Sequence, residues 1–392
     1  MPRSPELSKR AVALKPSLTL QISARAKALA NEGRDICSLS AGEPDFNTPE
    51  FIVEAARTAL SDGITRYGPA AGDPELRLAV AEKLTRENGI PTTSDQVLIT
   101  NGGKQAIFNL LQVLLNPGDE VLLPAPYWLS YPEMAALAGA RTITIPSTAD
   151  DGFQLDLKAL ESRISPKSRL LILNTPSNPT GRVMQRSELE QLAELVGRHP
   201  NLMVMCDEIY EYLLGDGLVH HSFAAVAETI RHRCFTVNGF AKGWAMTGWR
   251  LGYLAGDETV IKAAAALQSQ STSNVCSFAQ RGALAAILGS RDCVSEMAAS
   301  YNLRRGRLCE GLASIDGITL IPPQGAFYAF PQLPESVMGS VEFCRRALDQ
   351  EGLAVVPGLA FGDDRCIRLS CAVSRETITD GLERLKRVLG SF

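Results

Sequence analysis

Short runs rich in valine, isoleucine and leucine alternate with helical patterns through the middle of this 392-residue chain, between Asp73 and Asp257. Each run has the length of a buried β-strand and is followed by turn-forming residues. Strands of this composition that alternate with helices form a mostly parallel sheet covered by helices on both faces. The expected strands are Gln96–Thr100, Glu120–Pro124, Arg141–Pro146, Arg169–Thr175, Leu202–Glu208, Cys234–Asn238 and Leu251–Ala255. The sequence therefore predicts an α/β fold built on a seven-stranded sheet.

The unusual loops of the chain follow strands of this predicted sheet. They read NGGKQ, APYW, TPSNPTG, DEIY and GFAK. In open sheets of this class, ligands bind beyond the C-terminal ends of the strands. We therefore expect a functional site at that edge of the sheet.

Lys242, in the segment GFAKGW, is the residue most suggestive of chemistry. It sits between small residues in an otherwise uncharged neighbourhood, just after a predicted strand. Desolvation and nearby cations lower the pKa of such an amine and free its lone pair for a Schiff base. The alternative is an ordinary loop lysine that points into solvent, so the neighbouring loops must decide between the two.

Asp207 closes an apolar run and is expected to be buried at a strand end. A buried carboxylate needs a cation or strong hydrogen-bond donors, and a protonated pyridine nitrogen is one suitable partner. Capping of the next turn is the alternative. Asn178 and Tyr210 could donate to a phenolate oxygen, although turn chemistry and simple packing explain them equally well.

An anion could bind where Gly102 and Gly103 open a helix with free backbone N–H groups. The segment is not a P-loop, because Leu98 and Gln105 occupy positions where that motif requires glycine and Ser or Thr. Arg250 could clamp a phosphate, with a structural ion pair as the alternative.

Two further side chains are candidates for ligand contacts. Trp128 could stack on a planar ring, although a core tryptophan is the default interpretation. Arg368 alternates with apolar residues in a predicted strand, so its guanidinium could hold a carboxylate as a bidentate fork. An exposed strand residue is the alternative for Arg368.

Composition excludes several classes of function. A net charge of −4 with mixed charge distribution gives no electrostatic footprint for nucleic acid or anionic lipid. We expect no membrane span, because no apolar run approaches the required length. The nine cysteines are scattered without a CxxC, and the N-terminus lacks a signal-peptide pattern, so we expect reduced thiols, no metal site and a cytoplasmic protein.

The ends of the chain are expected to form a smaller domain. A helix is predicted over Leu18–Gly33, and a strand over Ile318–Pro323 belongs to an α+β layer. We expect residues 1–48 to form an N-terminal arm and part of the small domain. Residues 49–289 are expected to form the large domain and residues 290–392 the C-terminal small domain.

Taken together, these segments resemble the class I, fold-type I aminotransferases that use pyridoxal phosphate, and within them the bacterial and plastid-type Iβ branch of aspartate aminotransferases. The resemblance covers essentially the whole chain. It is carried by SAGEPDFNTP, RYGPAAG, TNGGKQ, PAPYWLSYPEM, NTPSNPTG, CDEIYE, AKGWAMTGWRLG, GAFY, VVPG and IRLS. It implies a large domain with a mostly parallel seven-stranded sheet, a smaller α+β domain and a homodimer with shared sites.

The resemblance also implies roles for individual residues. Lys242 matches the Schiff-base lysine and Asp207 the partner of the pyridine nitrogen. Tyr210 and Asn178 match the donors to the ring oxygen, and Trp128 matches the aromatic residue that stacks on the ring. At the phosphate, Gly103 and Lys104 match the backbone cradle, Arg250 matches the arginine, and the partner subunit's Tyr67 matches a tyrosine that reaches across the interface.

Substrate contacts are implied in the same way. Gly42 and Arg368 match groups that hold the α-carboxylate, with Trp128 and Asn178 beside them. Two departures from the animal-type pattern occur, since Lys104 replaces a hydroxyl residue and Gly239 replaces a phosphate-binding serine. In the Iβ branch the lysine matching Lys104 is thought to hold the distal carboxylate, and Lys15 is a second candidate.

The implied reaction is a ping-pong transamination between L-aspartate and 2-oxoglutarate, in which the freed amine of Lys242 moves the Cα proton. Small-molecule amino acids and 2-oxo acids would be the only partners besides a second copy of the chain. Two alternatives stay open. One is transamination of prephenate, and the other is β-elimination by a C–S lyase of the same fold.

Overall fold

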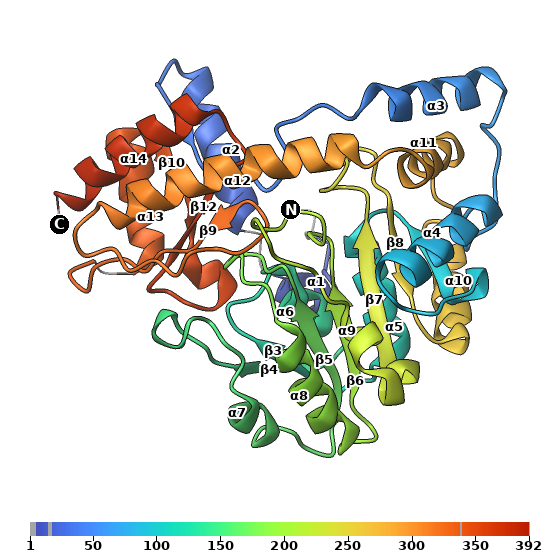
Figure 1. Ribbon diagram of the computed structural model, residues 1–392. Coiled ribbons are helices and arrows are strands. Elements are labelled where there is room, and N and C mark those ends of the chain that lie inside the picture. Colours follow the sequence, from blue (N-terminus) through green and yellow to red (C-terminus); the bar gives the residue numbers. More distant parts are fainter. Residues whose placement is uncertain (1–4, 15–17, 338, 392) are drawn as a thin grey trace.

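The computed structural model describes residues 5–14, 18–337 and 339–391, and a seven-stranded sheet lies at its centre (Figure 1). The strands follow the order β2-β8-β7-β6-β5-β3-β4, and all run parallel except β8, which is antiparallel to both of its neighbours. The mostly parallel α/β sheet expected from the sequence is therefore confirmed. Its strands are β2 (Val97–Thr100), β3 (Glu120–Pro124), β4 (Arg141–Ile145), β5 (Ser168–Asn174), β6 (Met203–Asp207), β7 (Cys234–Gly239) and β8 (Gly252–Ala255).

Successive residues of each strand pack on opposite faces of the sheet, which explains the continuous apolar runs. In β5, Leu171 and Leu173 join one hydrophobic cluster, whereas Leu170 and Ile172 join another. Helices α4 (Pro74–Glu87), α8 (Arg186–Gly197), α9 (Phe223–Val226) and α11 (Ser277–Leu288) cover the first face, and α5 (Gly103–Leu114), α6 (Ser130–Leu137) and α10 (Glu258–Ser271) cover the second.

Aspartates fix the starts of several of these helices. The carboxylate of Asp73 accepts the backbone N–H groups of Glu75 and Leu76, and Pro74 occupies the first helical position of α4. Asp156 caps α7 (Leu157–Glu161) and Asp257 caps α10 in the same way. Local sequence therefore sets where these segments leave the sheet.

A second layer holds the ends of the chain, at the left of Figure 1. Strands β11 (Val356–Pro357), β12 (Ile367–Ser370) and β9 (Tyr328–Ala329) form an antiparallel sheet, and β1 (Cys37–Ser38) pairs in parallel with β10 (Leu353–Ala354). The helices here are α2 (Leu18–Asn31), α12 (Asp292–Ala313), α13 (Ser340–Glu351) and α14 (Arg375–Leu389).

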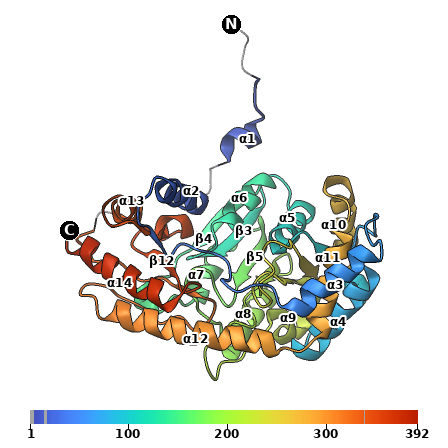
Figure 2. The same ribbon diagram turned by 90° about the horizontal axis from the view of Figure 1, so that it is seen from above.

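Helix α12 connects the two layers. Val294, near its start, packs in the cluster of the large sheet, whereas Tyr301 and Leu308 pack in the cluster of the small sheets. Helix α3 (Glu50–Ser61) packs against α11 at the other end of the molecule. Figure 2 shows the short helix α1 (Lys9–Ala13) standing clear of the rest of the chain.

The structure differs from the sequence prediction at several elements. The strand expected over Ile318–Pro323 is wrong, because Thr319 makes only an isolated bridge to Gln332 and the consecutive prolines Pro322 and Pro323 lack N–H donors. Helices α4 and α14 were not predicted, and other boundaries shift by one or two residues. In the part of the chain that the structure describes, no helix is both long and apolar enough to cross a membrane.

Candidate active site

A cavity of about 360 Å³ lies at the C-terminal edge of the sheet, where the end of β12 also arrives. The loops after β2, β3, β5, β6 and β7 all contribute to its wall. The structure thus brings together most of the candidates named from the sequence. They are Gly42, Gly103, Lys104, Trp128, Asn178, Asp207, Tyr210, Lys242, Arg250 and Arg368.

Lys242 follows β7 and lines the cavity. Its Nζ donates a hydrogen bond to the backbone carbonyl oxygen of Gly42 and lies 5.5 Å from the ring centroid of Phe327. Burial, followed by the nearby charge of Arg368, lowers the pKa of the amine from 10.5 to about 8. A substantial fraction of the side chain is therefore a neutral nucleophile near physiological pH, which an ordinary surface lysine is not.

Asp207 ends β6 and is 6% exposed. Its Oδ2 accepts a 2.7 Å hydrogen bond from the hydroxyl of Tyr131, and its Oδ1 accepts the backbone N–H of Ile209 at 3.2 Å. Burial raises the pKa of Asp207 to about 6, and the Tyr131 hydrogen bond opposes that rise. Among the described residues this buried carboxylate has two neutral donors and no cationic partner in direct contact, so the cavity suits a ligand that brings one.

The start of α5 and Arg250 form a positively charged wall of the cavity. Gly102 has a φ of +84°, and a Cβ at this position would lie 2.6 Å from Nη2 of Arg250. The helix N-terminus and the guanidinium therefore meet without an intervening side chain. Burial, followed by the charge of Arg250, lowers the pKa of the Lys104 amine. Together, the N-terminus of α5, Arg250 and Lys104 favour the binding of an anion at this wall.

Gly239 and Gly252 allow two strands to approach this wall closely. A Cβ on Gly252 would lie 2.4 Å from the backbone nitrogen of Gly103, and a Cβ on Gly239 would lie 2.7 Å from Cα of Gly252. A serine at position 239 would therefore displace backbone atoms. This close packing gives a physical reason for the glycine.

Arg368 lies inside the cavity wall and is 2% exposed, so the alternative of an exposed strand residue is wrong. Its Nη1 donates to Oδ1 of Asn178 at 2.9 Å, and its Nη2 donates to the carbonyl oxygen of Ser40 at 3.2 Å. The guanidinium also lies 4.4 Å from the ring centroid of Tyr328. Its buried Nε has no hydrogen-bond partner among the described residues. The group thus retains capacity for an anionic ligand.

Two aromatic candidates complete this wall. The hydroxyls of Tyr210 and Tyr328 lie 2.9 Å apart, and both side chains are buried. Trp128 packs edge-to-face on Tyr131, with ring centroids 5.3 Å apart, and Nζ of Lys104 lies 4.8 Å from the Trp128 centroid. A planar ligand could therefore meet an aromatic face beside the cationic wall.

One candidate is not brought into this cavity, and another cannot be placed. Tyr67 is 92% exposed and does not line it, and Lys15 lies outside the described residues. Tyr131, which contacts Asp207, and Tyr328, which contacts Tyr210, were not predicted from the sequence as site residues. Both lie in motifs that carry the family resemblance, PAPYWLSYPEM and GAFY, but local sequence pattern gives no sign of their hydroxyl contacts.

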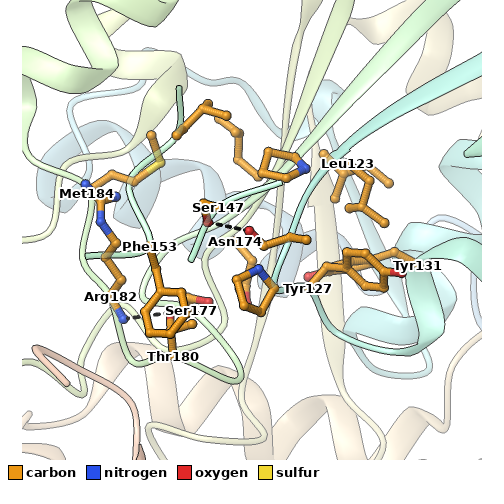
Figure 3. Close-up of a pocket in the computed structure, with 16 residues that line it drawn as sticks. Leu123, Tyr127, Tyr131, Ser147, Phe153, Asn174, Ser177, Thr180, Arg182 and Met184 are labelled. Atoms are coloured by element: carbon orange, nitrogen blue, oxygen red, sulfur yellow. Dashed lines mark hydrogen bonds between the residues drawn. The ribbon is translucent and has the colours of Figure 1, made fainter. Parts of the chain in front are cut away.

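Figure 3 shows a second, smaller cavity of about 60 Å³ that shares Tyr131 and Asn174 with the first. Ser147, Phe153 and Arg182 are among the side chains around it. Its volume holds a few water molecules at most, whereas ligand sites typically occupy several hundred Å³. The larger cavity is therefore the candidate active site.

A partly buried amine of lowered pKa, a buried carboxylate and a cluster of cations at the edge of a mostly parallel sheet define an α/β enzyme whose site is centred on a lysine. Comparison with known families agrees, because a model described as aminotransferase class I and II matches residues 34–385. The chain therefore belongs to the class I and II aminotransferases, and it is an aminotransferase.

Curated relatives resemble the chain over nearly its full length. A bifunctional aspartate aminotransferase and glutamate/aspartate-prephenate aminotransferase of Petunia hybrida is 47% identical, over 98% of this chain and 82% of the relative. An aspartate/prephenate aminotransferase of Thermus thermophilus is 44% identical, over 98% and 99% of the two chains.

Solved structures show the same relationship. An aspartate aminotransferase from Thermus thermophilus with maleate superposes with a TM-score of 0.94 at 44% identity, covering 98% of this chain and 100% of the other. An aspartate aminotransferase from Rhizobium meliloti gives a TM-score of 0.95 at 36% identity, with 99% of each chain covered. The resemblance stated from the sequence motifs is thus confirmed at the level of family and fold.

Proposed function

We propose that this chain uses pyridoxal 5′-phosphate to transfer the amino group of L-aspartate to 2-oxoglutarate, which yields oxaloacetate and L-glutamate. The observation that carries the proposal is the pair Lys242 and Asp207, an amine of lowered pKa and a buried carboxylate on the wall of one cavity. The names of the relatives, aspartate or aspartate/prephenate aminotransferases, support the choice of substrate.

The cavity fits the cofactor in size and in chemistry. Asp207 would hold the ring nitrogen, since this carboxylate lacks a cationic partner in direct contact. The phosphate would sit at the cationic wall, with the partner subunit's Tyr67 reaching it across a dimer interface. Tyr210 and Asn178 would donate to the ring oxygen and Trp128 would stack on the ring, whereas the backbone N–H groups of Gly103 and Lys104 and the side chain of Arg250 would hold the phosphate.

When bound, pyridoxal phosphate supplies a covalent attachment for the amino group and a protonated ring that accepts electrons from the substrate Cα. The residues of this chain would supply binding and proton transfer. The amine of Lys242, neutral above about pH 8, would take the proton from Cα and return it as general base and then acid. Asp207 would keep the ring nitrogen protonated.

Arg368 and Gly42 would orient the substrate through its α-carboxylate. Arg368 is already held by Asn178 and Ser40, so little side-chain entropy would be lost on binding. Lys104, on the cavity wall, would hold the distal carboxylate. Lys15 is a second candidate for that contact and lies outside the described residues.

Prephenate is the second candidate substrate. The relatives named aspartate/prephenate aminotransferase favour it, at identities similar to that of the plain aspartate aminotransferases. Aspartate and prephenate each carry one carboxylate beside the amino or oxo group and a second, distal carboxylate. The same two cations, Arg368 and Lys104, would therefore bind both substrates.

One experiment tests the cofactor and the substrates in sequence. Purified protein incubated with pyridoxal phosphate should develop a visible absorption band, and excess aspartate should bleach it with release of stoichiometric oxaloacetate. Turnover with aspartate and 2-oxoglutarate is then compared with glutamate-dependent amination of prephenate. A colourless protein, or a band that aspartate does not change, would overturn the proposal.

We further propose a homodimer, a division into domains and a reducing compartment such as the cytoplasm. Exposed apolar side chains on the arm and on α3, including Leu7, Val12 and Leu60, support an interface.

The separate hydrophobic clusters of the large and small sheets support the division into 1–48, 49–289 and 290–392. Nine free cysteines support the compartment.

A further inference from the structure

A buried polar network lies behind the turn that carries two of the candidate site residues. In the segment DEIYE, Asp207 and Tyr210 line the cavity, and each is followed by a glutamate. Glu208 is fully buried and Glu211 is 7% exposed. Two carboxylates are therefore buried in a turn of only five residues, which is costly unless they are paired.

The first glutamate is held by residues that precede and start α9. Oε2 of Glu208 accepts a 2.6 Å hydrogen bond from Oγ of Ser222 and lies 3.1 Å from Nε2 of His220. Burial alone would raise the pKa of Glu208, but His220 and then Ser222 hold it below its ordinary value. Glu208 acts on His220 in the opposite direction. The carboxylate raises the pKa of His220, although burial alone would lower it.

The second glutamate is held by α4 and the residue that follows it. Nζ of Lys83, which is 1% exposed, donates to Oε1 of Glu211 and, at 2.7 Å, to Oδ1 of Asn88. Nδ2 of Asn88 donates to Oε2 of Glu211 and to Oγ of Ser222, each at 2.8 Å. Ser222 and Asn88 therefore join the two halves into one hydrogen-bonded network.

We define these six residues, Lys83, Asn88, Glu208, Glu211, His220 and Ser222, as the back network. Glu208, Glu211 and His220 offer ligand atoms within 4.8 Å of one another, a spacing that a metal ion could use. The ammonium group of Lys83 already contacts Glu211, however, and would repel a metal cation at that point. Glu208 raises the pKa of His220 and Lys83 contacts Glu211, so each carboxylate of the network faces a basic side chain.

We propose that the back network is a positioning device that holds the 207–211 turn, and with it Asp207 and Tyr210, in the orientation required by the cofactor. The inference rests on the proposed function. Asp207 and Glu208 are consecutive residues and both are buried, at 6% and 0% exposure, so a shift of the turn would move both together. Fixed partners behind a ligating group set its geometry, as outer-shell groups do at metal sites.

Glu208→Gln tests the proposal, with Glu120→Gln as the matched control. Glu120 is also a buried carboxylate of the large sheet, with Arg141, Ser165 and Ser168 as its donors, but it lies at the opposite end of β3 from the cavity. Both changes remove one buried charge from a hydrogen-bonded cluster, in which Glu208 has two side-chain donors and Glu120 has three. They should lower the thermal unfolding midpoint of the apoprotein by similar amounts.

The distinguishing readouts are the affinity for pyridoxal phosphate and the pH midpoint of its visible band. Glu208→Gln should weaken the binding of pyridoxal phosphate about tenfold, which is the lower end of the effect of losing an outer-shell partner. It should also move the pH midpoint of the visible band. Glu120→Gln should leave both unchanged. Should Glu208→Gln lower only the unfolding temperature, the network is merely structural and the proposal is overturned.

Ser222→Ala is a milder second variant in case Glu208→Gln does not fold. It removes the link between the halves and should weaken cofactor binding in the same direction, whereas unchanged binding would also overturn the proposal. A wild-type protein that develops no visible band contradicts the proposed function instead. The two failures are thus distinguishable.

Discussion

Tyr131 donates a 2.7 Å hydrogen bond from its hydroxyl to Oδ2 of Asp207, and both side chains are buried. Burial raises the pKa of Asp207 to about 6, while this bond acts in the opposite direction. Burial and the charge of Asp207 raise the pKa of the Tyr131 hydroxyl well above its ordinary value. Tyr131 therefore remains the donor and favours the ionised carboxylate.

Replacing Tyr131 with phenylalanine should raise the pKa of Asp207 further. The carboxylate would then be less ionised near neutral pH and would bind a protonated ring nitrogen less well. A hydrogen bond to a charged group contributes about 1.5–3 kcal/mol, so affinity for pyridoxal phosphate should fall about tenfold or more. Absorbance titrations at several pH values measure the loss, which should grow as the pH falls toward about 6.

Tyr127→Phe is the control for that change. Tyr127 lies in the segment before α6 and, like Tyr131, lines the smaller cavity, so its hydroxyl can be removed without removing the donor to Asp207. Its cofactor affinity should match that of the wild type. Equal losses in the two variants would contradict a specific role for Tyr131.

Asp207→Asn should have opposite effects on the apoprotein and on cofactor binding. The carboxylate has a higher pKa in the folded state, about 6, than its ordinary 3.8, so the folded state binds the extra proton between these values. Stability of the apoprotein therefore falls as pH rises through this window, by on the order of 3 kcal/mol. Asparagine avoids that cost and should stabilise the apoprotein near neutral pH.

The same variant should bind pyridoxal phosphate weakly, because the ring nitrogen loses its anionic partner. Thermal unfolding with and without the cofactor measures both effects. The apoprotein gain should largely disappear near pH 4, where wild-type Asp207 is also protonated in the folded state. An apoprotein that is destabilised at every pH would contradict the interpretation.

The pH dependence of Lys242 gives a third prediction. Its folded-state pKa of about 8 makes the amine neutral above that pH, whereas an ordinary lysine would need a pH near 10.5. The rate at which the visible band develops after mixing with pyridoxal phosphate should therefore rise through about pH 8. Arg368→Gln removes the cation that lowers this pKa most and should move the midpoint upward.

Arg368→Lys is the matched control for the charge. It keeps a cation on β12 and should leave the midpoint closer to that of the wild type, although it loses the bidentate fork. The experiment contains no amino-acid substrate, so the substrate contact proposed for Arg368 does not enter. An unchanged midpoint in Arg368→Gln would show that burial alone sets the pKa.

The sequence could predict the site residues that lie at or just beyond the ends of strands. Lys242 and Asp207 each follow an apolar run, and parallel strands bring the residues beyond their C-terminal ends to one edge of the sheet. Arg368 comes from β12, far along the chain, and only the family resemblance placed it beside them. Its burial depends on how the second layer packs, which no local pattern encodes.

Contacts among side chains could not be predicted in the same way. Tyr131 stands on α6 among apolar residues, so its pattern is that of a packed tyrosine, and its bond to Asp207 requires the relative placement of α6 and β6. The approach of Gly252 to Gly103 likewise depends on β8 running antiparallel between β2 and β7. Sequence patterns give the elements, and tertiary packing sets these distances.

The exposed side chain of Tyr67 leads to the last prediction, on subunit assembly. At 92% exposure it has no structural role in the isolated chain, so Tyr67→Ala should leave the folding of a subunit unchanged. If the partner subunit's Tyr67 completes each site, this variant should nevertheless bind pyridoxal phosphate more weakly and lose activity. Lys242→Ala should abolish turnover while still binding the cofactor, because its other contacts remain.

Mixing the two variants distinguishes shared sites from separate ones. In a hybrid dimer of Lys242→Ala and Tyr67→Ala subunits, one site carries both changes and the other carries neither. Unfolding and refolding an equal mixture should therefore restore activity, up to about a quarter of the wild-type value for random pairing in a two-fold dimer. Refolding each variant alone is the control. If the mixture gives only the average of the two separate activities, Tyr67 does not act across an interface.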